Sequence, residues 1–327
     1  MTRAVSVLIH ESQFPSRLRT ELLESFRTQK VNHKFLYDSV RQTSRWQAVH
    51  EACSPAHNDP EIRAVYDRGF EYAATRLLAS QVELVALGCG GGHKDARFLQ
   101  VLRRSNKAIA CFPCDVSTPM VLTARETILN AVPSIHCSPV VCDLASVQDS
   151  AELFPRPSSC ETRRFVTFFG MIPNFEPSVI LPRLAAMLSR DDLLLFSANL
   201  APGPDYAEGL RRVLPQYDNA PTREWLFGFL YDHGVEPHDG ELRFSVVEPD
   251  GNGLKRIEAT FSFQRACSIR VEGESFSFSP GDAFRLFFSY RYTPGLLETE
   301  LQKHGLIVRE RWVAHSGEEG VFLVVRD

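Results

Sequence analysis

Residues 84–102 read LVALGCGGGHKDARFLQVL, and this stretch decides the fold. An apolar run ends in a turn of glycine and cysteine at 88–92, and apolar residues then recur at Phe98, Leu99 and Leu102. A change from continuous to helical apolar spacing predicts a buried strand, a glycine turn and a helix. Either the turn is simply tight, or something must lie close against its backbone.

The same alternation of strand and helix continues through the middle third of the chain. We expect strands at 82–89, 108–117, 138–145, 163–175 and 191–200, and helices at 93–104, 119–132 and 178–189. The fourth strand is almost continuously apolar, which is typical of a strand covered on both faces. The alternation predicts an α/β fold, with a parallel sheet between two layers of helices.

The last residues complete this picture. Two extended runs at 305–316 and 320–327 are joined by the short segment GEE, which predicts a closing β-hairpin. A doubly wound, Rossmann-like sheet that ends in such a hairpin resembles the class I methyltransferases. This resemblance concerns the fold and does not by itself fix a function.

Two regions depart from the alternation. Residues 10–75 have the pattern of helices and loops, and residues 201–291 have helical runs followed by strand-like runs. We predict that they form one α+β substrate-binding lobe. The sheet domain, which would bind the cofactor, then comprises 76–200 and 292–327.

Composition excludes several classes of protein. The chain has 327 residues, 44% of them apolar, and a formal net charge of −4 with scattered basic residues, which argues against a nucleic-acid-binding surface. There is no apolar run long enough for a membrane span. The first apolar patch is interrupted by His10 and Glu11 and is too short for a secretory signal. We expect a cytoplasmic monomer.

The eight cysteines raise the possibility of zinc, chiefly through CFPC at 111–114. A structural zinc site needs a second ligand pair at suitable spacing, and there is none. In an extended segment, moreover, Cys111 and Cys114 would point to opposite faces. We therefore predict no metal site, and mostly buried, reduced thiols.

Two carboxylates follow the strands after the glycine turn. Asp115 lies about 20 residues beyond the turn, where an acid accepts from the ribose hydroxyls of a nucleoside cofactor. Asp143 ends the next strand and is placed to accept from an adenine amine, with Leu144 against the ring. Each aspartate alone is more readily explained as a helix cap or a solvated turn residue. Together with a turn that lacks G-x-G-x-x-G, they favour an S-adenosyl cofactor over a dinucleotide.

Motifs in the same order and spacing make a family resemblance specific. They are KFLYDSV (34–40), LGCGGGHK (87–94), FPCDVS (112–117), CDL (142–144), FFGMIPNF (168–175), QYD (216–218), RIEATF (256–261) and FSYRYTPG (288–295). From Lys34 onward the chain resembles the histidine Nα-methyltransferases of ergothioneine biosynthesis, a family that includes dimethylallyltryptophan N-methyltransferases. The resemblance implies S-adenosylmethionine as cofactor.

The resemblance also implies roles for individual residues. Cofactor contacts would come from Gly88 and Gly90 in the turn, Lys94 near the methionyl carboxylate, Asp115 at the ribose, and Asp143 with Leu144 at the adenine. On the acceptor side, Asn174 and Tyr217 would hold an α-carboxylate, while Ser289 and the pocket residue Tyr37 would orient the amine for catalysis. Asn174 as a helix cap near residue 178 and Tyr217 as a half-buried structural residue remain alternative interpretations.

Four departures from the family pattern concern the acceptor and the turn. The glutamate that reads imidazole is Phe287 here, and a strand methionine is Ala259. The tyrosine-rich YYP segment has become CSPAHND (53–59), and the acid before the glycine turn is Ala86. A pocket that has exchanged its hydrogen-bonding acid for a phenyl ring no longer favours imidazole.

We therefore expect methylation of the α-amino nitrogen of an amino acid or similar small molecule other than histidine, with Phe287, Ala259 and Ser289 in its pocket. Two alternatives stay open. The first is another use of the cofactor, by transfer or cyclisation of its aminocarboxypropyl arm or by S- or O-methylation. The second is a non-catalytic protein that only binds the cofactor.

Overall fold

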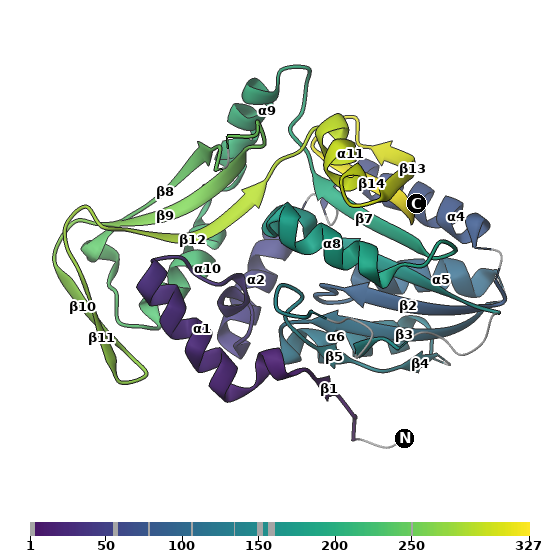
Figure 1. Cartoon of the computed structure of the whole chain (residues 1–327), viewed down its shortest axis with the longest axis horizontal. Coiled ribbons are helices and arrows are strands. Elements are labelled where there is room, and N and C mark those ends of the chain that lie inside the picture. The colour runs from purple at the N-terminus through teal and green to yellow at the C-terminus, as the bar shows by residue number, and fades with distance from the viewer. Residues whose placement is uncertain are drawn as a thin grey trace. The chain divides into compact units, whose positions relative to one another are not determined.

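The chain forms two compact units, each assembled from separate stretches of sequence (Figure 1). The computed structural model describes residues 4–54, 58–77, 79–105, 107–133, 135–148, 153–155, 161–249 and 251–327. The first unit, here the sheet unit, comprises Met1–Gln13, Asp59–Leu200 and Tyr292–Asp327. The second unit, here the lobe, comprises Phe14–Asn58 and Ala201–Arg291.

The sheet unit contains one large sheet. Its strands are β1 (Leu8–Ile9), β2 (Gln81–Leu87), β3 (Ala108–Asp115), β4 (His136–Cys137), β5 (Val140–Val141), β6 (Thr162–Phe169), β7 (Leu193–Asn199), β13 (Leu306–Val313) and β14 (Glu319–Arg326). The strand order is β1-β5-β3-β2-β6-β7-β14-β13, with β4 also paired to β3. All pairs are parallel except β14 with β7 and β13 with β14. The predicted parallel sheet with a closing hairpin is confirmed.

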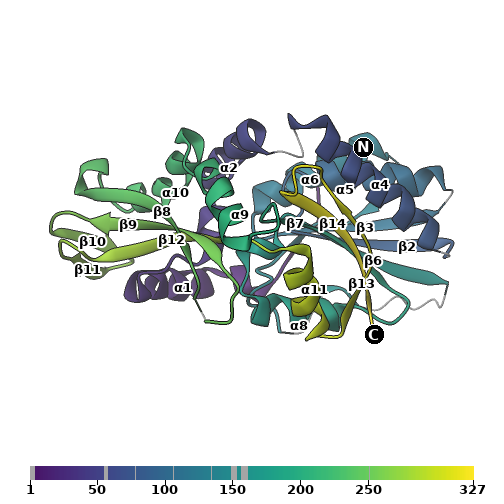
Figure 2. The same ribbon diagram turned by 90° about the horizontal axis from the view of Figure 1, so that it is seen from above.

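Helices cover both faces of this sheet. They are α4 (Pro60–Arg76), α5 (His93–Arg104), α6 (Thr118–Ala131), α8 (Pro177–Met187) and α11 (Pro294–Gln302), with 3-10 turns η1 (Glu11–Gln13) and η3 (Ile172–Asn174). Figure 2 shows α4, α5 and α6 on one face and α8 and α11 on the other. The central strands are buried on both faces, as their continuous apolar sequence predicts.

The lobe packs helices against antiparallel strands. Its helices are α1 (Pro15–Thr28), η2 (His33–Leu36), α2 (Val40–Cys53), α9 (Tyr206–Val213), η4 (Leu214–Gln216), α10 (Ala220–Tyr231) and η5 (Pro237–Asp239). Its strands are β8 (Gly240–Val247), β9 (Arg256–Phe263), β10 (Cys267–Val271), β11 (Glu274–Phe278) and β12 (Ala283–Tyr290). Strands β12, β9 and β8 form a sheet in that order, and β10 pairs with β11. Aromatic residues from helices and strands fill its core.

The division of the chain differs from the predicted boundaries at the N-terminal side. Residues 59–75, which we expected in the lobe, belong to the sheet unit. The reason is that α4 packs on the closing hairpin: a Cβ at Gly69 would lie 3.0 Å from Val321 and 3.3 Å from Trp312. Residues 10–13 also belong to the sheet unit, since β1 just before them pairs with β5.

The cysteines in the described ranges carry free thiols, and four of them are buried. Sγ of Cys114 lies 3.2 Å from Sγ of Cys142. Cys160 lies outside the described residues. Within the described ranges, no helix combines the length and the apolar character that crossing a membrane requires.

Candidate active site

The glycine turn joins β2 to α5 through three residues with positive φ: Gly88 (56°), Gly90 (50°) and Gly92 (74°). A Cβ at Gly92 would lie 2.8 Å from Cα of Ala124 in α6. A Cβ at Gly88 would lie 2.6 Å from Cγ of Met171. Internal packing against the backbone of α6 therefore accounts for glycine at position 92, which supports the tight-turn alternative considered from the sequence. At Gly88 the near neighbour is the side chain of Met171.

The turn lies beside the carboxyl ends of the neighbouring strands. The backbone N–H of Gly90 donates to Oδ2 of Asp115 at 3.0 Å. The N–H of Cys142 donates to the carbonyl of Asp115, also at 3.0 Å, which places the following Asp143 at the same edge. The predicted convergence of three strand ends is thus present, at the edge where open α/β sheets bind ligands.

Asp115 is held by its own turn as well as by Gly90. Its Oδ1 accepts from the N–H of Ser117 at 3.1 Å. Burial raises the pKa of the carboxyl group, and the hydrogen bonds from Gly90 and Ser117 oppose that effect. Each oxygen has a second lone pair, so the carboxylate can still accept from two ribose hydroxyls.

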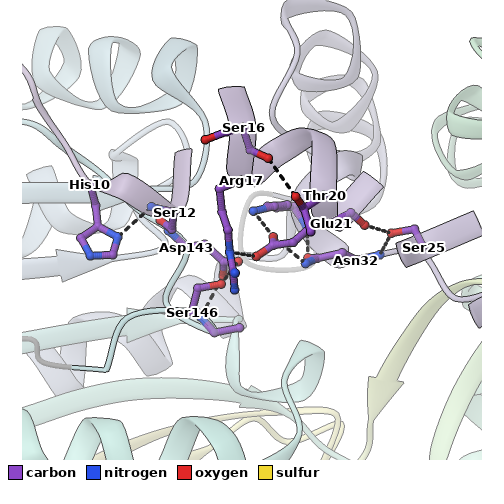
Figure 3. Close-up of polar contacts among 12 residues, drawn as sticks. His10, Ser12, Ser16, Arg17, Thr20, Glu21, Ser25, Asn32, Asp143 and Ser146 are labelled. Carbon is purple, nitrogen blue, oxygen red and sulfur yellow. Dashed lines mark hydrogen bonds and ion pairs between the residues drawn. The ribbon is translucent and has the colours of Figure 1, made fainter. Parts of the chain in front are cut away.

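Asp143 organises the segment that follows β5. Figure 3 shows it beside Ser12 and Ser146. The N–H of Asp143 donates to Oγ of Ser12 at 3.0 Å. Its Oδ1 accepts from the N–H of Ala145 and its Oδ2 from Oγ of Ser146, both at 2.8 Å. The turn role considered from sequence is therefore real.

Leu144 borders a cavity of about 190 Å³ between this segment and α8. Its walls are mainly apolar and include Leu87, Val147 and Ile180. Nη1 of Arg183 donates to the carbonyl of Leu144 at 2.8 Å and fixes the backbone there. Such a surface suits the flat face of an apolar ring.

Lys94 is the second residue of α5 and takes part in a buried polar cluster. Its ammonium donates to Oη of Tyr66 at 2.9 Å. The same phenol oxygen lies 2.5 Å from Oε1 of Glu319 and 2.7 Å from Oγ of Ser197. Sequence reasoning found Lys94 but missed these three partners, because they come from distant segments with no shared motif.

In the lobe, two predicted residues and one that was not predicted share one face of β12 and of the residue that follows it. Phe287, Ser289 and Arg291 are two residues apart, so their side chains point the same way. Tyr217 lies along this face, with Oη 3.0 Å from Oγ of Ser289 and 2.9 Å from Nε of Arg291. Arg291 was missed, although its spacing from Ser289 could have revealed it.

Phe287 lies among aromatic rings. Its ring centroid is 5.6 Å from that of Trp225 and 5.5 Å from that of His33, and the His33 ring is nearly parallel to it. Ala259 is its partner across the strand pair β9–β12 and is fully buried. Tyr37 also packs on Trp225, with the two ring centroids 5.5 Å apart. The residues predicted to form the side-chain pocket thus cluster in one place.

His33 is a further member of this cluster that sequence reasoning missed. Burial, with Arg285 and Arg256 nearby, lowers its pKa to about 3. The imidazole is therefore neutral at physiological pH. Its buried Nε2 has no hydrogen-bond partner among the described residues.

Asn174 is the last residue of η3 in the sheet unit. Helix α8 begins at Pro177 after the N-cap residue Glu176, and no side chain caps it. The alternative role of Asn174 as a cap is therefore wrong. Its role toward an acceptor stays a prediction.

Residues 18–208, more than half of the chain, match the profile of the family described as "Histidine-specific methyltransferase, SAM-dependent". The chain belongs to this family. S-adenosylmethionine is accordingly its cofactor, and the mostly parallel sheet with its closing antiparallel hairpin is the fold of the class I methyltransferases. The methyltransferase family is the one expected from the sequence motifs.

No curated protein matches the methyltransferase. Among solved structures, it is similar to the CcbJ methyltransferase from Streptomyces caelestis, with 15% identity, TM-score 0.40, and coverage of 80% of this chain and 96% of that chain. It is also similar to magnesium protoporphyrin IX methyltransferase from Synechocystis PCC 6803 with bound SAH, with 12% identity, TM-score 0.46, and coverage of 90% and 100%.

Proposed function

We propose that this methyltransferase transfers the methyl group of S-adenosylmethionine to the α-amino nitrogen of an amino-acid-like small molecule with an apolar or aromatic side chain, and not to histidine. The observation that carries the proposal is Phe287. It stands where the family's histidine enzymes have a glutamate that reads imidazole, and it packs against the rings of Trp225 and His33.

Methyl transfer from a sulfonium needs little acid–base catalysis by the protein. The amine lone pair attacks the methyl carbon, the carbon–sulfur bond breaks, and S-adenosylhomocysteine leaves; a proton of the resulting ammonium then passes to solvent. The sulfonium already carries a good leaving group, the neutral thioether, so no acid is needed to activate it. The protein has to align the reactants and bind the amine in its unprotonated form. An α-amino group has a pKa near 8, so part of it is neutral at working pH.

The cofactor would be held in the sheet unit. Gly88 and Gly90 would lie against it, Asp115 would accept from its ribose, and Asp143 with Leu144 would contact its adenine. Lys94 would meet its carboxylate. Support comes from the hydrogen bonds that bring the glycine turn and the ends of β3 and β5 together.

An acceptor carboxylate would be held through Tyr217. Nε of Arg291 donates to its phenol oxygen, and the guanidinium lies 5.1 Å from the ring centroid. The phenol proton, which points to Oγ of Ser289 here, would turn to the carboxylate while Ser289 donates to the phenol oxygen in its place. A phenol that accepts from a buried cation is a stronger donor to an anion. Ser289, 1% exposed and hydrogen-bonded to Tyr217, would orient the amine together with Tyr37.

The side chain of the acceptor would be chosen by the aromatic cluster. Phe287, Trp225 and Tyr37 offer ring faces and no acid, and Ala259 has a smaller side chain than the methionine of the family. A histidine side chain would find no acid there to replace its hydrogen bonds to water, and each polar group left without a partner costs about 1–3 kcal/mol. Aromatic or aliphatic side chains have no such hydrogen bonds to water to give up.

Incubation with S-adenosylmethionine and a panel of amino acids, read by mass spectrometry, tests the proposal. The expected result is a gain of one to three methyl groups on an aromatic or apolar amino acid, with no product from histidine. Tandem fragmentation places the methyl group on the α-nitrogen. Efficient methylation of histidine, release of methylthioadenosine, or binding without consumption would each contradict the proposal.

The variant Phe287→Glu is the matched specificity test. It restores the acid at this position, so we expect histidine to become a better acceptor and aromatic amino acids to become worse ones. The control Phe288→Glu adds the same charge one residue along β12, on the opposite face. An equal change in both variants would show that position 287 does not read the acceptor.

A further inference from the structure

The polar cluster around Tyr66 joins four separate elements of the sheet unit. Tyr66 lies in α4, Lys94 in α5, Ser197 in β7, and Glu319 at the start of β14. Tyr66 and Ser197 are fully buried, and Glu319 is 5% exposed. Burying a carboxylate and an ammonium is costly unless their hydrogen bonds are satisfied, so such a cluster calls for an explanation.

The hydrogen bonds in the cluster have only one consistent direction. An ammonium only donates and a carboxylate only accepts, so Tyr66 accepts from Lys94 and gives its single proton to Glu319. Ser197 must then donate its own proton to the phenol oxygen. Both lone pairs and the proton of Tyr66 are used, which leaves it no freedom to turn away from Lys94.

The charges around Lys94 act in opposite directions. Burial lowers the pKa of its ammonium, and Arg97 adds to that effect. Glu319 and Asp95 raise it. Burial and the neighbouring Glu319 also raise the pKa of Tyr66 well above 10, so the phenol keeps its proton and stays a bridge. Glu319 therefore favours the charged form of Lys94, which burial disfavours.

Lys94 has hydrogen-bonding capacity to spare. Its ammonium has three N–H groups, and in the part of the chain that the structure describes one partner, Tyr66, accepts from it. The lysine is two residues beyond the glycine turn, at the carboxyl edge of the sheet. S-adenosylmethionine contains a single anionic group, the carboxylate of its methionyl end, and Lys94 is a cation at the edge where that cofactor binds.

We propose that Glu319, acting through Tyr66, is a positioning residue that holds the Lys94 ammonium toward the methionyl carboxylate of the cofactor. The inference rests on the proposed role of Lys94 as a cofactor ligand. Glu319 lies outside residues 18–208, the segment that matches the family profile. The carboxyl-terminal hairpin thus contributes to cofactor binding without touching the cofactor.

Two ligands separate this role from a structural one. S-adenosylhomocysteine carries the amino acid arm, whereas 5′-methylthioadenosine has a methyl group in its place. In calorimetric titrations we expect Glu319→Gln and Tyr66→Phe each to weaken binding of S-adenosylhomocysteine about tenfold, since a hydrogen bond to a charged group is lost. Binding of 5′-methylthioadenosine should change less than twofold.

The pH dependence supplies a second measurement. Without Glu319 the pKa of Lys94 falls further, so Glu319→Gln should lose affinity for S-adenosylhomocysteine at a lower pH than the wild type does. The affinity for 5′-methylthioadenosine should show no such shift. Lys94→Ala removes the ammonium altogether, so it gives the largest loss of affinity for S-adenosylhomocysteine that this interaction can account for.

Glu83→Gln is the matched control. Glu83 also lies in the sheet unit, at the opposite end of β2, and pairs with the buried Arg164 at 2.8 Å. The Glu83→Gln variant should have a lower Tm, and the ratio of its affinities for S-adenosylhomocysteine and 5′-methylthioadenosine should equal that of the wild type. If Glu319→Gln and Tyr66→Phe weaken both ligands equally, or weaken neither, the inference is wrong. If the wild type binds neither ligand, the proposed cofactor site fails instead.

Discussion

A single phenol, Tyr217, connects most of the residues proposed for the acceptor. It contacts Phe287 through its ring and both Ser289 and Arg291 through its hydroxyl. Sequence motifs predicted Tyr217 and Ser289, because each lies in a recognisable segment. They did not predict Arg291 or His33, whose importance comes from neighbours that the lobe brings together over long distances in sequence.

Tyr217→Phe should raise the acceptor KM about tenfold, since the hydroxyl that would meet the carboxylate is lost while the ring stays packed. Unfolding free energy should fall by about 1–3 kcal/mol, because Ser289 is left buried with one partner fewer. Steady-state kinetics and denaturant titration measure the two effects. Tyr290→Phe removes a hydroxyl from the opposite face of β12, where Arg256 donates to it at 3.1 Å. An equal rise in KM there would contradict the assignment.

His33 predicts a dependence of stability on pH. Its pKa is about 3 in the folded protein and 6.5 in the unfolded chain. Below pH 6.5 the unfolded chain binds a proton that the native protein does not, so this residue costs stability as the pH falls toward 3. His33→Phe should remove that cost and retain about 2 kcal/mol more of its stability than the wild type between pH 7 and pH 5.

Asp38 gives the control of opposite sign. Burial raises its pKa from 3.8 to about 6, so the native protein binds a proton that the unfolded chain does not bind until lower pH. Relative to wild type, Asp38→Asn should therefore lose about 1 kcal/mol of stability over the same pH interval. Chemical denaturation at pH 7 and pH 5 checks both variants; parallel behaviour of the two would refute these pKa directions.

At the scale of elements, predictions that rest on local sequence were more accurate than predictions that depend on contacts between distant segments. The helix predicted at 93–104 is α5 (His93–Arg104), because its glycine turn and apolar spacing lie within one short stretch. The third predicted strand, 138–145, is reduced to β5 (Val140–Val141), since Asp143 bends the following residues into a turn. Assignment of α4 to the lobe failed because its partner, the closing hairpin, lies more than two hundred residues away.

Gly92→Ala tests why the turn is glycine-rich. The positive φ costs about 1–2 kcal/mol for alanine, and the clash with Ala124 adds about 1–3 kcal/mol. Gly305→Ala is the control, since Gly305 has a similar φ of 68° with no atom within 4 Å of its Cβ. Urea titration should show the larger loss at Gly92. Equal losses would mean that backbone conformation alone demands glycine.

At the scale of the whole molecule, the chain crosses between its two units four times, at 13/14, 58/59, 200/201 and 291/292. The alternation of strands and helices in the middle third of the chain predicted the sheet. The two extended runs near the carboxyl terminus predicted the hairpin. The boundaries could not be predicted to the residue, because they depend on which unit buries each helix. Hydrogen exchange can show which unit receives the cofactor.

Adding S-adenosylhomocysteine should slow amide exchange at 88–94, 115–117 and 143–147 in the sheet unit. At a hundred times its Kd it should add about 2.7 kcal/mol of stability. The β10–β11 hairpin of the lobe is the internal control and should exchange at an unchanged rate. Protection of the hairpin without protection of the glycine turn would place the cofactor elsewhere.

The contact between Tyr66 and Glu319 joins residues 253 positions apart in the chain. At roughly 5–20 residues per second, a ribosome needs on the order of 10–50 s to synthesise the intervening polypeptide. Throughout that interval the nascent protein has the glycine turn, Tyr66 and Lys94, but not the acid that we propose to hold the lysine in place. On that proposal, tight capture of the methyl donor becomes possible only when translation has passed the closing hairpin.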